Sequence, residues 1–248
     1  MKIFSTLLAI TITTLFISGC SDDTTTNTPV VGKNYISFST GNYWIYTNTT
    51  IDDKGAAVGT PSVDSTVVLQ QTTKGGKSAS MLVTYNEGNA DTSYYYKGTD
   101  NSIYQWFDID LQSLVSGTTA TIPQFWAKVL AGDKAVSTSL DTTIKGIEYD
   151  LNGTKIPLDI KFKVTSQSGN DTTITFNGTT YSAAQSTSTL SVIAYQANTT
   201  VAILTLSTPQ KIVYLENNGI FSTYTPGVNL FGTPINGSKT MLTKMSVK

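Results

Sequence analysis

Apolar and polar residues alternate along much of the chain beyond residue 34. The clearest case is residues 157–165, where every second residue is large and apolar and Asp, Lys and Thr occupy the positions between. Shorter stretches at residues 174–176, 202–206 and 241–247 repeat this period, the last with residues 241, 243, 245 and 247 on one face. Because successive side chains of a strand point to opposite faces, the pattern predicts strands with one buried face.

Turn signals separate these stretches. Asn-Gly dipeptides supply the positive φ angles of tight type I′ hairpin turns. They occur at residues 152–153, 177–178, 218–219 and 236–237, and Lys54-Gly55, Gly75-Gly76 and Glu87-Gly88 punctuate the first half of the chain similarly. The sequence therefore predicts an all-β fold, built as a meander of about ten to thirteen antiparallel strands.

One stretch predicts a helix instead. Residues 121–132 begin with Thr, carry Pro123 near the first turn and end at Gly132. Phe125, Trp126, Val129 and Leu130 have the spacing of one apolar helical stripe. Residues 108–115 predict one or two further helical turns. We expect these one or two short helices to lie against the concave side of the sheet.

Composition supports the β assignment and removes many function classes. The chain contains 43 Thr, whose branched Cβ fits a pleated sheet. Its 16 basic and 17 acidic residues nearly cancel, so no strong field attracts nucleic acid. All the basic residues are Lys, so the sequence offers no imidazole base, no histidine metal ligand and no bidentate arginine clamp. We expect no nucleic-acid partner, no metal, no cofactor and no catalysis.

The beginning of the chain has the features of a targeting segment. Lys2 precedes an apolar run that ends in Ile17-Ser18-Gly19-Cys20, and Cys20 is the one cysteine of the sequence. This ending resembles the bacterial lipobox, in which the cysteine thiol receives a lipid before the signal peptide is removed. The resemblance implies a signal peptide at residues 1–19 and a lipid-anchored Cys20. The composition of the following residues predicts a flexible tether up to residue 33. The strand and turn pattern predicts a single antiparallel β domain at residues 34–248.

The residues behind the cysteine bear on the destination. Ser21, Asp22 and Asp23 resemble the export signal that carries lipoproteins of the Bacteroidota to the outer face of the outer membrane. The resemblance implies display on the cell surface. The alternative is that the protein lies on the periplasmic face of the same membrane, and that both acids only solvate the tether.

Aromatic residues crowd the first predicted hairpins, where they occupy both faces of the strands. One interpretation is an ordinary core with amphipathic rings at its rim. The other is a concave face that binds an apolar or glycan ligand beneath the predicted helix. The candidate ligand-binding residues are Trp44, Tyr46, Tyr95, Trp106, Phe125 and Trp126.

Two short motifs resemble those of uncharacterised lipoproteins of the Bacteroidota. Gly41-Asn42-Tyr43-Trp44-Ile45-Tyr46 is similar to their Gly-Asn-x-Trp-x-Tyr opening, and residues 214–221 are similar to their closing hairpin. By analogy, the resemblance implies that the meander forms a curved antiparallel sheet or open barrel of the kind seen in lipoprotein carriers.

Three function classes follow from these observations. The first is a lipid-anchored envelope protein without catalysis that binds an apolar or glycan ligand in its concave β face. The second is a structural or adhesive surface module that binds other proteins. The third is a hydrolase that uses Asp and Glu side chains, although no spacing among the acidic residues singles out a pair. A ring-lined cavity would favour the first class and a filled core the second.

Overall fold

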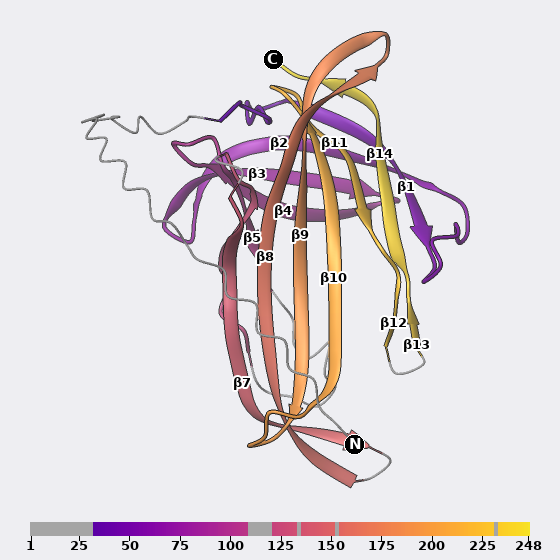
Figure 1. Ribbon diagram of the computed structural model, residues 1–248. Coiled ribbons are helices and arrows are strands. Elements are labelled where there is room, and N and C mark those ends of the chain that lie inside the picture. The colour runs from indigo at the N-terminus through magenta and orange to yellow at the C-terminus, as the bar shows by residue number, and fades with distance from the viewer. Residues whose placement is uncertain (1–31, 109–120, 133–134, 152–153, 231–232) are drawn as a thin grey trace, which may run out of the picture.

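The computed structural model describes residues 32–108, 121–132, 135–151, 154–230 and 233–248, and the regular elements in these residues are all strands (Figure 1). Their bounds are β1 Tyr43–Ile51, β2 Ser62–Lys74, β3 Lys77–Asn86, β4 Asn89–Lys97, β5 Ile103–Phe107, β6 Phe125–Leu130, β7 Ser137–Leu151, β8 Thr154–Phe176, β9 Thr179–Gln196, β10 Ala202–Leu215, β11 Gly219–Thr225, β12 Val228–Leu230, β13 Thr233–Ile235 and β14 Gly237–Ser246. The predicted all-β fold is confirmed.

Twelve strands form one antiparallel sheet in the order β6-β5-β4-β3-β2-β1-β14-β11-β10-β9-β8-β7, and β12 and β13 form a separate two-stranded ribbon. Neighbours in the sheet are mostly successive hairpin strands. The exception is β14, which lies between β1 and β11 and so joins the two ends of the domain in the middle of the sheet. In Figure 1 the long strands β7–β10 run side by side, and β2–β4 cross near their upper ends.

The two outer strands of the sheet, β6 and β7, approach each other without pairing. Serine hydroxyls bridge the gap. Ser186 Oγ of β9 donates to Val129 O at 2.5 Å, Ala131 N donates to Ser168 Oγ of β8 at 2.8 Å, and Lys128 N donates to Ser139 Oγ of β7 at 3.0 Å. The sheet is therefore a nearly closed barrel, which confirms the predicted open barrel.

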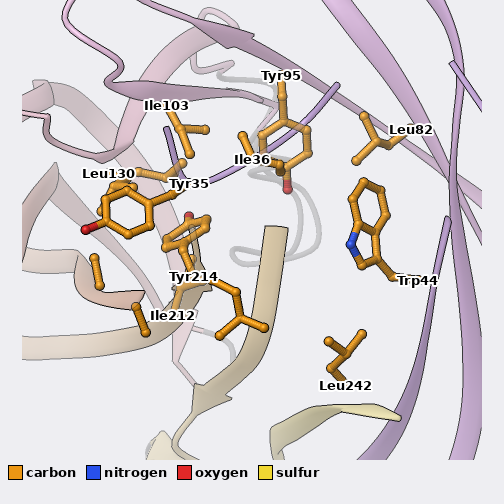
Figure 2. Packing of buried hydrophobic residues seen from close by; sticks show 14 of the residues in the cluster. Tyr35, Ile36, Trp44, Leu82, Tyr95, Ile103, Leu130, Ile212, Tyr214 and Leu242 are labelled. Atoms are coloured by element: carbon orange, nitrogen blue, oxygen red, sulfur yellow. The ribbon is translucent and has the colours of Figure 1, made fainter. Parts of the chain in front are cut away.

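The interior holds two apolar clusters. The larger one joins both halves of the sheet and includes Trp44, Leu82, Tyr95, Ile103 and Tyr214 (Figure 2). The smaller one lies along the long strands and centres on Phe162, which is completely buried. The alternation predicted for residues 157–165 is confirmed, because Leu158, Ile160, Phe162 and Val164 are all buried on this inner face.

The segment before β1 belongs to the core. Tyr35 and Ile36 are buried in the larger cluster. Their backbone is fixed by the β10–β11 turn, where Asn217 N donates to Asn34 O at 2.7 Å and Gly219 N donates to Tyr35 O at 3.0 Å. The segment before β1 thus fills part of the barrel interior.

The predicted helix at residues 121–132 is wrong, because residues 125–130 form strand β6. Phe125 pairs with Phe107 and Trp126 with Trp106 across the edge of β5. A register shift in this ladder lets both Val129 and Leu130 be buried, which in the sequence imitates a helical stripe. Pairing also satisfies the open backbone groups of β5, which a helix here would leave unpaired. The second predicted helix, at residues 108–115, lies almost wholly outside the described residues.

Tight turns follow the sequence at several predicted positions. Positive φ angles occur at Gly75 and Gly76, at Glu87 and Gly88, and at Asn177 and Gly178, where they close the hairpins β2–β3, β3–β4 and β8–β9. Asn236-Gly237 does not form a hairpin turn but leads from β13 into β14. A Cβ on Gly237 would lie 2.2 Å from Thr225 O, so this glycine serves a close backbone approach.

The β10–β11 turn and strand β14 also depart from the predicted pattern. In the turn the left-handed residues are Asn217 and Gly219, so Asn218-Gly219 is not a two-residue type I′ turn. In β14 a register shift against β1 falls at Thr243 and reverses the alternation. Leu242, rather than Met241, is therefore buried, so the face predicted from residues 241–247 holds only for residues 245 and 247.

Candidate functional site

A pocket opens on the concave face between β1, β2, β3, β4, β11 and β14. Its volume is about 200 Å3. Its apolar lining is contributed by Ile36, Trp44, Tyr46, Leu82, Tyr95 and Ile220, and its polar lining by Asp64, Thr66, Thr84, Ser93, Thr223 and Thr240. Each of β1, β2, β3 and β4 contributes two side chains, two positions apart in the sequence, because alternate residues of a strand share one face.

The rings of the floor are fixed by hydrogen bonds at their polar ends. Trp44 Nε1 donates to Asn218 O at 2.5 Å, and the Tyr46 hydroxyl donates to Ile220 O at 3.1 Å. Gly219 makes room for the indole, because a Cβ there would lie 3.0 Å from two atoms of Trp44. These contacts leave Trp44 2% and Tyr46 8% exposed, so each ring presents only a small part of its surface to the pocket.

Burial keeps the phenols of the floor neutral. It raises the pKa of Tyr95 to about 12, with Asp91 adding to the shift and Ser93 opposing it. It also raises the pKa of Tyr46, and the neighbouring Tyr95 adds to this shift. At physiological pH both hydroxyls therefore act as uncharged hydrogen-bonding groups.

The polar rim contains one carboxylate and several hydroxyls. Both Asn86 Nδ2 and Ser62 Oγ donate to Asp64 Oδ1. Thr66 and Thr84 share a hydrogen bond of 2.8 Å between their hydroxyls. Asp64 is the one carboxylate among the lining residues that the structure describes, so the pocket there lacks the pair that glycoside hydrolysis uses.

Three of the six predicted ligand-binding residues, Trp44, Tyr46 and Tyr95, meet at this pocket. Phe125 does not. It faces inward on β6, stacks on Phe107 with ring centroids 6.0 Å apart, and packs against the smaller core cluster.

Trp106 and Trp126 lie on the opposite, outer face of the sheet. There they form a cluster with three tyrosines of β4 and β5, and three lysines lie over the rings. We call this the aromatic-lysine face; its members are Tyr94, Tyr96, Tyr104, Trp106, Trp126, Lys74, Lys77 and Lys128. The predicted cavity beneath a Phe125/Trp126 helix is therefore wrong, because the two side chains point to different sides of one strand.

Sequence reasoning missed the polar side of the pocket. Asp64, Thr84 and Ser93 gain their position only from the pairing of β2, β3 and β4. The available signal was weak, since Asp64 and Thr66 occupy alternate positions before Val68 in a stretch rich in Thr and Val. Thr is too common in this chain for such a pattern to stand out.

The lipidation and export residues, Cys20, Ser21, Asp22 and Asp23, lie outside the described residues. Within the described ranges, no helix has the length and apolarity needed to cross a membrane. Nor does that part of the chain contain a group of three or more His, Cys, Asp and Glu side chains arranged to hold a metal ion.

Comparison with known proteins yields two distant structural matches. A crystal structure of a protein assigned as a lipoprotein from Parabacteroides distasonis ATCC 8503 is 14% identical, with a TM-score of 0.41 over 87% of this chain and 99% of that one. A protein assigned as exported, with a YmcC-like fold, from Bacteroides fragilis NCTC 9343 is 9% identical, with a TM-score of 0.38 over 86% of this chain and 99% of that one. No family model and no curated protein matches the chain. At these identities and TM-scores, the likeness shows neither a shared family nor a shared function.

Proposed function

We propose that this chain is a lipid-anchored envelope protein without catalysis, whose concave β face binds a small glycan or apolar ligand. The observation that carries the proposal is the pocket on that face, in which an aromatic floor meets a rim of hydroxyls and one carboxylate. Rings that bind an apolar surface, together with a few placed polar groups, are the usual components of a small-molecule site.

The size of the pocket limits its ligand. Sites for drug-sized ligands have volumes of about 300–1,000 Å3, and this one has about 200 Å3. One ring-sized group fits it, such as a single sugar unit at the end of a glycan. The hydroxyl-rich rim favours the sugar over a purely apolar ligand, because an apolar ligand would leave Asp64 desolvated and without a ligand group to bond.

The absence of catalysis is part of the proposal. The sequence has no His to activate a nucleophile, and the lining of the pocket offers one carboxylate rather than two. The pKa values of Tyr46 and Tyr95 lie far above neutral pH, so these phenols are poorly suited to proton transfer in catalysis.

A pocket-filling variant tests the binding. Ser93→Leu extends an apolar side chain into the pocket, whereas Thr92→Leu, its neighbour on β4, adds the same side chain on the other face. We expect calorimetric titration with a panel of monosaccharides and disaccharides to show binding that is lost in Ser93→Leu and kept in Thr92→Leu. Equal binding by both variants, or no binding of any sugar or apolar probe by the unaltered protein, would contradict the proposal.

A second candidate is the structural or adhesive surface module that binds other proteins. It is favoured by the filled interior of the barrel, where Trp44, Phe162 and Tyr214 are each at most 2% exposed. Two results together would support this candidate. This protein would bind no small molecule, and a surface protein would bind specifically to its outer strands.

The anchor and its destination form a separate step of the proposal. Cys20 carries the lipid, and Ser21, Asp22 and Asp23 direct the protein to the outer membrane surface. Cys20→Ser should move the protein out of the membrane fraction. Asp22→Ala with Asp23→Ala should keep lipidation, measured by mass spectrometry, but remove protease accessibility on whole cells. Unchanged protease accessibility in this double variant would mean that Asp22 and Asp23 do not direct the protein to the cell surface.

A further inference from the structure

The aromatic-lysine face is an organised surface that the proposed ligand site does not use. Its rings form one continuous contact. Tyr96 stacks on Tyr104 with centroids 4.4 Å apart and interplanar angle 3°, and it meets Trp126 edge-on at 4.7 Å. Trp126 in turn contacts Trp106 at 5.1 Å. The cluster lies on the outer side of β4, β5 and β6, where its rings are half-buried and the β2–β3 turn covers part of the two tryptophans.

Lysine ammonium groups lie above these rings. Lys74 Nζ is 4.8 Å from the ring centroid of Tyr94 and 5.4 Å from that of Trp106. Lys77 lies 5.9 Å from Tyr96, and Lys128 lies 5.7 Å from Tyr104. None of the ion pairs found among the described residues involves these three lysines. The charges of Lys74 and Lys77 are thus available to an anionic partner, and Lys128 shares its charge with the nearby carboxylate of Asp100.

The acidic groups near the face are already engaged at its ends. Asp100 accepts hydrogen bonds from Ser102 N and Oγ at 3.0 and 2.6 Å. Burial alone would raise the pKa of Asp100, but these hydrogen bonds and the positive charge of Lys128 hold it below its ordinary value. Asp108 accepts a hydrogen bond from Gln124 Nε2. The centre of the face is therefore cationic and aromatic.

The chain enters the described domain beside this face. Gly32 N donates to Asp100 O at 3.3 Å, and Asn101 Nδ2 donates to Gly32 O. Asp100 and Asn101 belong to the turn between β4 and β5, the strands that carry the stacked Tyr96 and Tyr104. Eleven residues separate Gly32 from Cys20. A flexible chain of this length spans about 20 Å on average.

We propose that the aromatic-lysine face docks on the phosphate-bearing surface of the lipid bilayer that holds the Cys20 anchor. This rests on the lipid anchor of the proposed function but not on the concave pocket. Trp and Tyr rings favour the membrane–water interface, where the ring body contacts the acyl boundary and the polar end stays hydrated. Lysines on the same surface bind lipid phosphates. Docking would hold β4–β6 against the membrane and orient the body relative to it.

Two indole groups add to this picture. Trp106 Nε1 and Trp126 Nε1 are buried and have no hydrogen-bond partner within the residues the structure describes. Both rings lie beneath the β2–β3 turn, where a Cβ on Gly75 would be 2.2 Å from Trp106 Cζ3 and 3.0 Å from Trp126 Nε1. A shift of this turn on docking would expose two N–H donors of the kind that bind lipid carbonyl and phosphate oxygens.

The test uses the full-length acylated protein reconstituted into vesicles of phosphatidylcholine with phosphatidylglycerol, compared with phosphatidylcholine alone. Brominated phospholipids in these vesicles quench tryptophans at the interface. Two of the three tryptophans lie on the face, while Trp44 is buried inside the barrel. We expect quenching in the acidic vesicles that weakens at ~1 M salt, where the Debye length is about 3 Å. The double variant Trp106→Phe with Trp126→Phe should show none.

Charge variants separate docking from anchoring. One lysine near an anionic surface changes an equilibrium roughly fivefold, so Lys74→Gln, Lys77→Gln and Lys128→Gln together should lower the ratio of docked to undocked protein on the order of a hundredfold. The matched control replaces Lys163, Lys211 and Lys239, which lie on the long strands and β14, by Gln. Far-UV circular dichroism confirms that each variant is folded, and sedimentation with vesicles reports the anchor.

Each outcome decides between the proposals. Quenching that is lost in the first triple variant and kept in the control supports docking. Acylated protein that sediments without quenching overturns docking and leaves the anchor standing, and protein that is not acylated yet is quenched supports docking and overturns the anchor. A tryptophan response to a soluble anionic polysaccharide, with none to acidic vesicles, overturns the membrane in favour of a glycan. Protein that binds neither kind of vesicle overturns both proposals.

Discussion

The buried hydroxyl of Tyr214 gives a sharp test of the interior. Tyr214 is 0% exposed, and its hydroxyl has no hydrogen-bond partner among the described residues. Figure 2 shows its ring within the larger apolar cluster, near Tyr35 and Ile212. Tyr214→Phe removes the hydroxyl and keeps the ring. Tyr46→Phe is the matched control, because the Tyr46 hydroxyl is also buried but donates to Ile220 O at 3.1 Å.

The two variants should change stability in opposite directions. A buried polar group without a partner costs about 1–3 kcal/mol, so Tyr214→Phe should raise the free energy of unfolding by about 1 kcal/mol after the lost packing of the oxygen is subtracted. Tyr46→Phe leaves the Ile220 carbonyl without its donor and should lower the free energy of unfolding by about 1–2 kcal/mol. For a domain of this size, 1 kcal/mol corresponds to a shift of about 2–4 °C in Tm.

Urea unfolding followed by circular dichroism measures both changes, and a thermal melt gives the corresponding shifts in Tm. The reasoning is refuted if Tyr214→Phe destabilises the protein as much as Tyr46→Phe does. That result would mean that the Tyr214 hydroxyl has a bonding partner, such as a buried water molecule.

Alkaline pH provides an independent check on the same residue. Burial raises the pKa of Tyr214 well above its ordinary value of 10, and the nearby Tyr95 and Tyr46 add to the shift. Above pH 10 the unfolded chain therefore releases this proton while the folded chain retains it. The contribution of this proton to the free energy of unfolding is fully present below pH 10 and is lost as pH rises further. In Tyr214→Phe the free energy of unfolding should fall less steeply between about pH 10 and 12.

The remaining predictions concern the β2–β3 turn, the gap between β6 and β7, and the core. Gly75→Ala should destabilise the protein by about 2–4 kcal/mol, because the new Cβ meets Trp106 and φ is +50°. Gly76→Ala, at φ +71° with open space around it, should cost about 1–2 kcal/mol. Equal urea midpoints for the two variants would argue against the close contact at Gly75. Ser186→Ala leaves the Val129 carbonyl without its donor and should cost about 1–3 kcal/mol, with faster amide exchange in β6, whereas Ser191→Ala on the same strand should change neither. Phe162→Ala, at a site that is 0% exposed, should lower the free energy of unfolding by about 3–5 kcal/mol in the same urea assay; a loss below 1 kcal/mol would mean that the cavity collapses.

The sequence by itself determined the features that depend on near neighbours in the chain. The alternation at residues 157–165 gives one buried face whatever the strand pairs with, and Gly75-Gly76, Glu87-Gly88 and Asn177-Gly178 adopt left-handed conformations that few other residue pairs tolerate. These local signals were sufficient to predict an antiparallel meander, whereas the open barrel was expected from the resemblance to lipoproteins of the Bacteroidota.

Only the tertiary structure decided the features that depend on pairing between distant strands. Residues 125–130 had a helical pattern, but the open edge of β5 made them a strand. The bulges beside Val129 and Thr243 changed which side chains are buried. A one-residue register shift moves every following side chain to the opposite face, and nothing within the strand itself reports the shift.

The same reason divided the predicted site. Trp44, Tyr46 and Tyr95 share the concave pocket because the bulged ladder between β1 and β14 and the pairing through β2 and β3 turn them inward. Trp106 and Trp126 differ from them in no local feature, yet the register of β5 and β6 turns them outward. Residue type identified the aromatic side chains, but the face that each one occupies is set by hydrogen bonds to strands elsewhere in the sequence.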